Sequence, residues 1–354
     1  MLEKTLNGPG RTLVANAPEG LDALLLARTL QSLGRAHLHV CRDDARMATM
    51  AESLGFFAPS LEVLAFPAWD CLPYDRVSPH RDIVARRLAV LSRLVRSDSA
   101  PEGLLVLTTV NALLQRLPPR HVLEGRMLSA APGERLSIDD LASFFAHNGY
   151  LRAETVGEPG EYALRGGIVD VFPAGSEQPL RLDFFGDTLE SIRAFDPLTQ
   201  ISSGKVDSLV LMPISEVVLE DETIGRFRSG YRAAFGAVTG DDPLYEAVSA
   251  GRAHPGMEHW LPLFYERLET LFDYLPGASV TLDHQAEEAR EARLESTADF
   301  YSARRDLSRA EAAAGSAYHA LPPERLYLDA AGWDGLLAER PSALFSPFDA
   351  PDDL

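Results

Sequence analysis

The chain has 354 residues, which is enough for two or three domains that each bury a hydrophobic core. Its formal net charge of −19 disfavours stand-alone DNA binding, because contacts to phosphate supply most of the non-specific affinity of DNA-binding proteins. The sequence has no run of 18 apolar residues, no secretory leader pattern and only two cysteines, Cys41 and Cys71, so we expect a cytoplasmic protein without a membrane span, disulfide framework or zinc motif.

The N-terminal segment has the pattern of a parallel α/β unit. Strand, turn, helix and strand follow one another at residues 12–15, 16–20, 21–33 and 37–41. In a nucleotide-binding domain the first turn would be a P-loop, which needs glycines, a Lys and a Ser or Thr. The stretch NAPEGLDA has one Gly, no Lys and no hydroxyl, and it adds Glu19 and Asp22, which would repel phosphate. We therefore expect no bound cofactor in this segment.

A loop rich in aromatic residues and proline follows a helix predicted at 43–54 and a strand predicted at 61–65. Its Trp69, Leu72 and Tyr74 could stack on nucleic-acid bases. Packing onto the edge of the domain is the more common role of such residues, and we favour it.

The helix predicted at 81–95 has a basic side, formed by Arg81, Arg86, Arg87, Arg93 and Arg96. This side could contact DNA phosphate or an acidic neighbour, although a solvated helix face is the ordinary interpretation. His80 precedes the helix with only Asp75 and Asp82 near it in sequence. Because a metal or catalytic site needs further ligands, we expect a hydrogen-bonded structural histidine and no metal or catalytic site.

A strand at 104–108 and a helix at 110–117 complete the first segment, which ends soon after Pro118-Pro119. We divide the chain into residues 1–122, 123–213 and 214–354, whose net charges are +2, −7 and −14. In the second segment Ser137 can cap a helix that ends at Asn148-Gly149.

The central stretch, residues 157–196, contains three short strand patterns separated by turns, at 167–172, at 180–185 and in a run that ends at Phe195. In the second run Leu180, Leu182 and Phe184 alternate with Arg181, Asp183 and Phe185, which predicts a small antiparallel sheet with one face on a core and one in water. An exposed Phe185 beside Arg and Asp is typical of a protein-binding hot spot. The alternative is that another part of the chain covers it.

The third segment predicts helices at 222–235, 243–250 and 285–314 and a strand-like run at 272–282. Trp260 and Phe264 are interpreted as core residues. The chain ends after Phe345 in an acidic tail that contains proline.

Three stretches resemble one family of bacterial repair proteins. The stretch RGGIVDVFPAG followed by LRLDFFGDTLESIRAFDPLTQ is similar to domain 2 of UvrB and, more closely, to the same domain of the transcription-repair coupling factors. FPAWDCLPYDRVSPHRDIVARRL at 66–88 and GMEHWLPLF at 256–264 resemble the coupling factors rather than UvrB. Together the three stretches cover most of residues 10–275.

The resemblance implies a RecA-like, helicase-type α/β domain that is split in sequence, lacks a working P-loop and holds an inserted α+β domain like domain 2 of UvrB. Residues 1–122 would be domain 1a, 123–213 domain 2, and 214–354 domain 1b with a tail. In the family, domain 2 docks UvrA. The family's contact motif falls on Arg165, Arg181, Phe185, Asp183 and Asp187, and extends to Glu190 and Arg193, where the alternation loses phase.

By the same resemblance, the chain would be an adaptor that recruits UvrA of nucleotide excision repair to RNA polymerase stalled at DNA lesions. The whole factor would be an ATP-dependent DNA translocase, with ATP and Mg in motor domains and with polymerase and DNA held by other parts. A distal domain would mask the docking face until polymerase is engaged. We expect this chain alone to have no ATPase activity, and we expect Arg181→Ala and Phe185→Ala to weaken UvrA binding while leaving the melting temperature nearly unchanged.

Two rival functions remain open from the sequence. One is a helicase-like domain with a cryptic nucleotide site, against which the missing Lys and hydroxyl weigh. The other is a sensor of damaged DNA, for which the short connection at Ser78-Pro79-His80 offers no hairpin to clamp a strand.

Overall fold

The computed structural model describes residues 2–8, 10–96, 103–238, 242–311 and 318–350. The chain forms two compact units. The first consists of Met1–Tyr74, Leu94–Leu117 and Leu268–Leu354, and the second of Asp75–Arg93 and Pro118–Arg267. The first unit is therefore split in sequence around the second.

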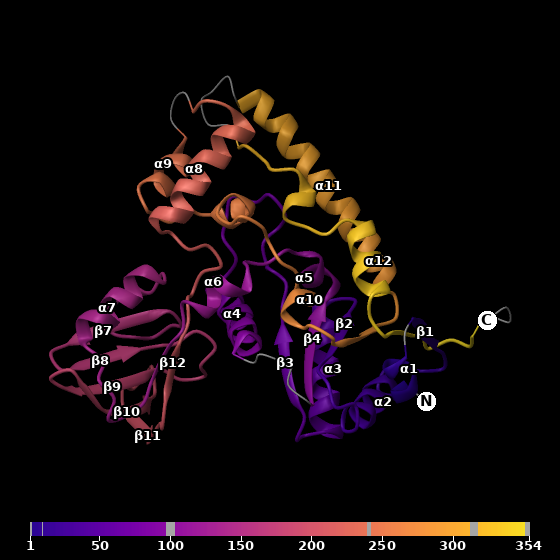
Figure 1. Cartoon of the computed structure of the whole chain (residues 1–354), viewed down its shortest axis with the longest axis horizontal. Helices are drawn as coiled ribbons and strands as arrows, with labels where there is room; N and C mark the ends of the chain where they lie inside the picture. The colour runs from indigo at the N-terminus through magenta and orange to yellow at the C-terminus, as the bar shows by residue number, and fades with distance from the viewer. Residues whose placement is uncertain (1, 9, 97–102, 239–241, 312–317, 351–354) are drawn as a thin grey trace. The chain divides into compact units, whose positions relative to one another are not determined.

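The first unit is built on a six-stranded parallel sheet in the order β1-β14-β13-β2-β4-β3, of which β1, β2, β3 and β4 are labelled in Figure 1. Its strands are β1 (Arg11–Val14), β2 (His37–Cys41), β3 (Glu62–Phe66), β4 (Leu104–Thr109), β13 (Ser279–Leu282) and β14 (Ser342–Phe345). Strands β13 and β14 come from the far end of the chain and lie between β1 and β2. This arrangement confirms the α/β class and the split in sequence.

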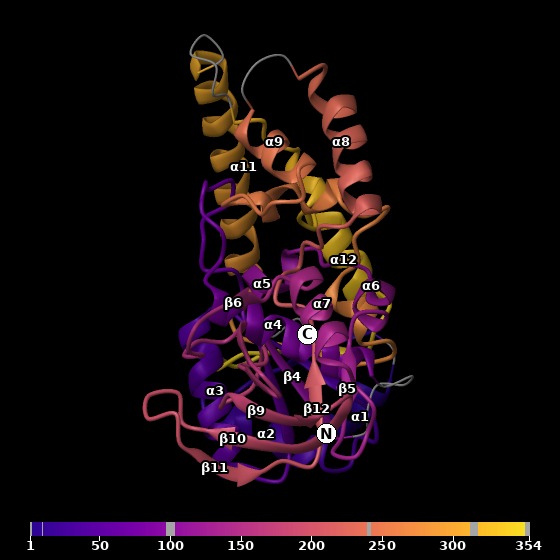
Figure 2. The same ribbon diagram turned by 90° about the vertical axis from the view of Figure 1, so that its left-hand side faces the viewer.

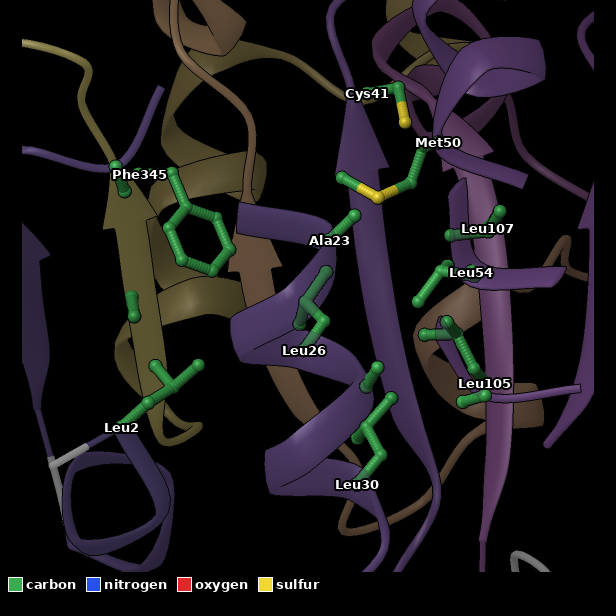
Figure 3. Packing of buried hydrophobic residues seen from close by; sticks show 14 of the residues in the cluster. Leu2, Ala23, Leu26, Leu30, Cys41, Met50, Leu54, Leu105, Leu107 and Phe345 are labelled. Carbon is green, nitrogen blue, oxygen red and sulfur yellow. The ribbon is translucent and has the colours of Figure 1, made fainter. Parts of the chain in front are cut away.

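Helices cover the first unit's sheet, and β2 is buried at every position. They are α1 (Leu2–Asn7), α2 (Leu21–Leu30), α3 (Asp44–Phe57), α5 (Val110–Leu114), α10 (Leu271–Tyr274), α11 (Ala286–Glu311) and α12 (Ala330–Ala338), with a 3-10 turn at Pro323–Arg325. Figure 3 shows apolar side chains of α2 and α3 meeting those of the sheet; the labelled residues are Leu2, Ala23, Leu26, Leu30, Cys41, Met50, Leu54, Leu105, Leu107 and Phe345. This cluster is a close-packed hydrophobic core on the α2 and α3 side of the unit.

Most local predictions in this unit are confirmed, although the helix predicted at 110–117 ends at Leu114 as α5, and one prediction is wrong. The Asp43 side chain accepts a hydrogen bond from the Arg46 N–H at 2.7 Å and so begins α3. The run at 272–282 is not one strand, because Thr270 and Asp273 form a capping box that starts α10 before β13. The predicted helix at 285–314 is present as α11, and its last three predicted residues lie outside the described residues.

The second unit contains a six-stranded mixed sheet in the order β11-β10-β9-β8-β7-β6. Its strands are β6 (Leu151–Arg152), β7 (Glu161–Arg165), β8 (Ile168–Val171), β9 (Leu180–Phe185), β10 (Thr188–Phe195) and β11 (Ser202–Lys205). All neighbours pair antiparallel except β6 and β7. The predicted three-stranded antiparallel sheet is thus the middle of a larger one, and Figure 2 shows β9, β10 and β11 side by side.

The second unit also holds a two-stranded sheet of β5 (Leu128–Ala130) and β12 (Leu209–Leu211). Its helices are α4 (Arg81–Val95, whose last two residues fall in the first unit), α6 (Arg120–Glu124), α7 (Ile138–His147), α8 (Asp221–Phe235), α9 (Pro243–Ser249) and a 3-10 helix at Met257–Leu263. The Ser137 side chain accepts from the Asp140 N–H and begins α7, as predicted. Trp260 and Phe264 are core residues, and Phe264 stacks on Phe227 of α8.

Candidate docking site on the β7–β10 sheet

The two faces of the second unit's sheet differ in what covers them. Leu180 and Leu182 belong to the core beneath α7, together with Leu141 and Phe145 of that helix. On β9 the alternate positions Arg181, Asp183 and Phe185 therefore point to the opposite face. The predicted inside and outside of this strand are confirmed.

The opposite face is only half exposed, which corrects the prediction that it lies in water. Val156, Ala163, Phe172 and Phe195 form a second, small buried cluster on it. The Gln200 Nε2 donates to the Val156 carbonyl at 3.1 Å and joins two of the segments around this cluster. The open half of the face lies toward the β7–β8 and β9–β10 turns.

Phe185 stands at the end of that open half, with 78% of its surface exposed. It precedes the turn at Gly186-Asp187, where Gly186 has a φ of 60° that favours glycine. Gly167 in the neighbouring turn packs so closely that an added Cβ would lie 3.0 Å from the Phe184 carbonyl oxygen. These two glycine turns place a large aromatic side chain in solvent on a short, well-paired hairpin.

A row of four residues crosses the strands beside Phe185. The pairing register places Arg165 opposite Ile168, Ile168 opposite Asp183, and Asp183 opposite Ser191. Ile168 is exposed on this face and was missed by the sequence analysis, because it reads as part of an apolar strand. The register alone reveals that it lies between a basic and an acidic residue.

Several charged residues on this face are held by other parts of the chain, and some pair with one another. Asp183 accepts from Arg193 Nη2 at 2.8 Å and from Ser191 Oγ at 2.6 Å. The Arg165 guanidinium, which is exposed, donates to the Glu154 carbonyl. Asp187 lies 3.4 Å from Arg135 Nη2 in an exposed pair.

Arg181 is the predicted site residue that differs most from expectation. Its guanidinium is largely covered, makes two hydrogen bonds to the buried Asp170 and lies 4.8 Å from the centre of the Phe195 ring. The hydrogen bond to Asp170 raises the pKa of Arg181 above its usual value. Arg181 thus supports the face from within rather than presenting a free guanidinium to a partner.

Glu190 is exposed at an irregularity in β10. The register of β10 on β9 shifts between Leu189 and Ser191, which indicates a bulge at Glu190. Leu189 and Ile192 are consequently both buried, although strict alternation would place them on opposite faces. This bulge is the physical reason why the alternation loses phase in the third run.

The β1–α2 turn of the first unit lies where a P-loop would be, and an internal ion pair fills its environment. The Asp22 carboxylate accepts from the backbone N–H groups of Gly20, at 2.9 Å, and Ala23, at 2.6 Å. Its other oxygen accepts from the buried guanidinium of Arg46, which also contacts Asp283 at 3.3 Å. A side-chain carboxylate therefore takes the N–H groups that a phosphate would need at the start of a helix.

Arg87, which the sequence places on a solvated basic side of α4, is instead fully buried and donates to the buried carboxylate of Glu216 at 2.5 Å, which corrects that expectation at this position.

The remaining candidates in the sequence have ordinary surroundings. Trp69 and Tyr74 are buried, as favoured, whereas Leu72 is 54% exposed. His80 is exposed, with its ring 3.8 Å from Asp82. Across the described ranges, no group of three His, Cys, Asp or Glu could hold a metal ion, and no helix is both long enough and apolar enough to cross a bilayer.

Comparisons with known proteins match the part of the chain that carries this candidate docking face. Residues 128–216, which include every strand of the mixed sheet, match the family model of the UvrB interaction domain. The chain is 36% identical over 272 residues to the transcription-repair-coupling factor of Haemophilus influenzae, which covers 77% of this chain and 23% of the relative. It is 35% identical over 291 residues to the factor of Rickettsia typhi, and this match covers 82% of this chain and 25% of the relative.

The chain is 36% identical over 275 residues to the factor of Escherichia coli, and this match covers 77% of this chain and 22% of the relative. The chain thus spans about a quarter of the length of the curated relatives it matches. These matches identify the chain as the counterpart of the N-terminal region of transcription-repair-coupling factors, with a UvrB interaction domain in its second unit.

Proposed function

We propose that this chain is an adaptor that docks UvrA on the open half of the β7–β10 face. The observation that carries the proposal is Phe185, a large aromatic residue that is 78% exposed within the residues matched by the UvrB interaction domain. Exposed aromatic anchors of this kind dominate binding energy when a partner provides an apolar pocket.

The row beside Phe185 supports a protein partner. Ile168 adds apolar area, and the paired Asp183 and Arg193 can form the polar rim that surrounds such anchors. Arg165 lies at the exposed end of the row and can make a bidentate contact to a carboxylate of the partner. In this proposal Arg181 acts indirectly, by holding the face in shape.

The first unit serves as a scaffold: a RecA-like, helicase-type domain that has lost its nucleotide site. The internal pairing of Asp22 with Arg46 supports this reading, because bound phosphate would have to displace a buried ion pair. We expect no cofactor in this chain.

The wider role follows from the family. The complete protein would recruit UvrA of nucleotide excision repair to RNA polymerase stalled at a DNA lesion, in the cytoplasm. ATP and Mg would act in motor domains outside this chain, which would make the whole protein an ATP-dependent DNA translocase. Its polymerase-binding and DNA-binding parts would also lie outside, and a distal domain would cover the docking face.

Isothermal titration of this 354-residue chain with UvrA tests the docking proposal. Wild type is expected to bind, and Phe185→Ala to bind much more weakly. The control is Leu72→Ala, which removes another exposed apolar side chain, 54% exposed, from the first unit. Loss of binding in the control but not in Phe185→Ala would show that the site is elsewhere.

A further inference from the structure

The turn between β10 and β11, residues 196–201, presents two apolar side chains to solvent. Leu198 is 92% exposed, the highest value for a large hydrophobic residue in the described parts of the chain, and Ile201 is 68% exposed. Single exposed apolar residues are common on protein surfaces, so exposure alone decides nothing. The construction and position of the turn carry the inference.

Internal hydrogen bonds fix the shape of this turn. The Asp196 carboxylate accepts from the backbone N–H groups of Leu198, at 3.0 Å, and Thr199, at 2.7 Å, and from the Thr199 hydroxyl. Gln200 has a φ of 61°, and its side chain donates to the carbonyls of Pro197 and Val156. The turn therefore holds Leu198 and Ile201 in place before any partner arrives, which lowers the entropic cost of burying them.

Arg181 connects this turn to the face that carries Phe185. Its side chain alternates with Asp183 and Phe185 on β9, and its Nη1 donates to the Gln200 carbonyl at 3.3 Å. Arg181 thus marks the place where the turn contacts β9, and its Cα atom lies about 13 Å along the strand from that of Phe185. A standard docking surface of about 800 Å² on each partner covers that distance.

We propose that Leu198 and Ile201 form a second apolar anchor of the docking face, which contacts the same partner as Phe185. This proposal rests on the proposed function and extends it, because it makes UvrA supply two apolar recesses on either side of a polar strip. Arg181, Asp196 and Gln200 are positioning residues that hold the second anchor. Along β9 and β10 the face would then present Phe185 at one end, charged residues in the middle, and Leu198 and Ile201 at the other end.

The net charge of the second segment favours a different protein as the partner of this face over a second copy of the chain or a lipid bilayer. Residues 123–213 carry a net charge of −7, which opposes both a second copy of the same surface and an anionic lipid bilayer. A different protein with a neutral or basic rim meets no such repulsion. A self-interface and a contact with the rest of a longer chain are therefore outcomes of the test that would overturn the proposal.

The test is titration of UvrA with the chain that carries Leu198→Ser and Ile201→Ser together. Because both side chains are exposed, the melting temperature should not change, and the dissociation constant should rise by about tenfold or more. Asp196→Ala, which frees the turn, should raise the constant by a smaller factor. Asp196→Asn, which keeps an oxygen that can accept the N–H groups, should restore binding and so separate positioning from general damage.

The outcomes separate this proposal from the proposed function. If Phe185→Ala weakens binding and the double variant binds like wild type, the second anchor is wrong and the docking function stands. If neither change weakens binding, both are wrong. If sedimentation shows that wild type dimerises and the double variant does not, the turn is a self-interface. The last case compares the 354-residue chain with a longer protein that contains it. If the double variant binds UvrA like wild type in the 354-residue chain but more tightly than wild type in the longer protein, the turn contacts the rest of the longer chain, and the second anchor is again wrong.

Discussion

The guanidinium of Arg181 donates two hydrogen bonds to the buried carboxylate of Asp170, from Nε to Oδ1 at 2.7 Å and from Nη2 to Oδ2 at 2.9 Å. The pair joins neighbouring strands, since Asp170 on β8 lies opposite Arg181 on β9. A residue that the family motif marks for partner contact is thus an internal support in this chain.

Replacing Arg181 with Ala should destabilise the second unit. The change leaves Asp170, which is 1% exposed, without its counter-charge, and breaking a buried pair in this way costs about 3 kcal/mol. Chemical denaturation should show this loss, and UvrA binding should weaken as a consequence. This revises the expectation that Arg181→Ala leaves the melting temperature nearly unchanged.

Arg193→Ala is the matched control for Arg181→Ala. It removes an arginine from the opposite position on β10, whose pair with Asp183 is partly exposed. An exposed pair contributes under about 1 kcal/mol, so stability should change little. Equal losses in the two variants would contradict the structural role assigned to Arg181.

Ile168→Ser should weaken UvrA binding by about fivefold to tenfold, the effect of removing one apolar contact from an interface. Ile168 lies on the open face between Arg165 and Asp183, so its loss should leave folding intact. Titration against UvrA and a thermal melt measure the two quantities. A large drop in melting temperature with unchanged affinity would show that Ile168 packs the hairpin rather than the partner.

Acid should destabilise the first unit through two buried histidines. His37 bonds Ser279 and Thr281 at 2.8 Å each, and His39 bonds Thr281 at 2.8 Å. Burial lowers the pKa of His37 from 6.5 to about 3, and burial together with nearby positive charge lowers the pKa of His39 well below 6.5. Both are neutral in the folded chain, whereas in the unfolded chain they take up protons below pH 6.5.

The contribution of neutral histidines is therefore complete above about pH 6.5 and declines as the pH falls toward 3. Each histidine should lower the free energy of unfolding by up to about 1.4 kcal/mol per pH unit in this range. Urea unfolding at pH 7.5 and 5.0 measures the loss. His37→Gln should reduce the dependence on pH, and an unchanged slope would show that other groups cause it.

Mg-ATP should leave the melting temperature of this chain unchanged. The N–H groups of Gly20 and Ala23 are already bonded to Asp22, and Arg46 is held by Asp22 and Asp283. A ligand that binds the folded state at 100 times its dissociation constant would add about 2.7 kcal/mol. A clear upward shift with millimolar Mg-ATP would therefore reveal a nucleotide site and overturn the scaffold reading.

Features that depend only on neighbouring residues could be predicted from the amino-acid sequence. Ser137 and Asp140 define the start of α7, the alternation from Leu180 to Phe185 assigns the two faces of β9, and the turn after β1 lacks the residues of a P-loop. Hydrogen bonds and side-chain directions within a few residues decide these features, so local pattern is sufficient.

Which residues on the outer face are exposed and which support it from within could not be predicted, because this depends on how the strands assemble. The Arg181–Asp170 pair, the place of Ile168 between Arg165 and Asp183, and the buried cluster around Phe195 all depend on strand order and register. The bulge at Glu190 shifts that register within one strand. Register is fixed by contacts between segments far apart in the chain, and a local pattern carries no record of them.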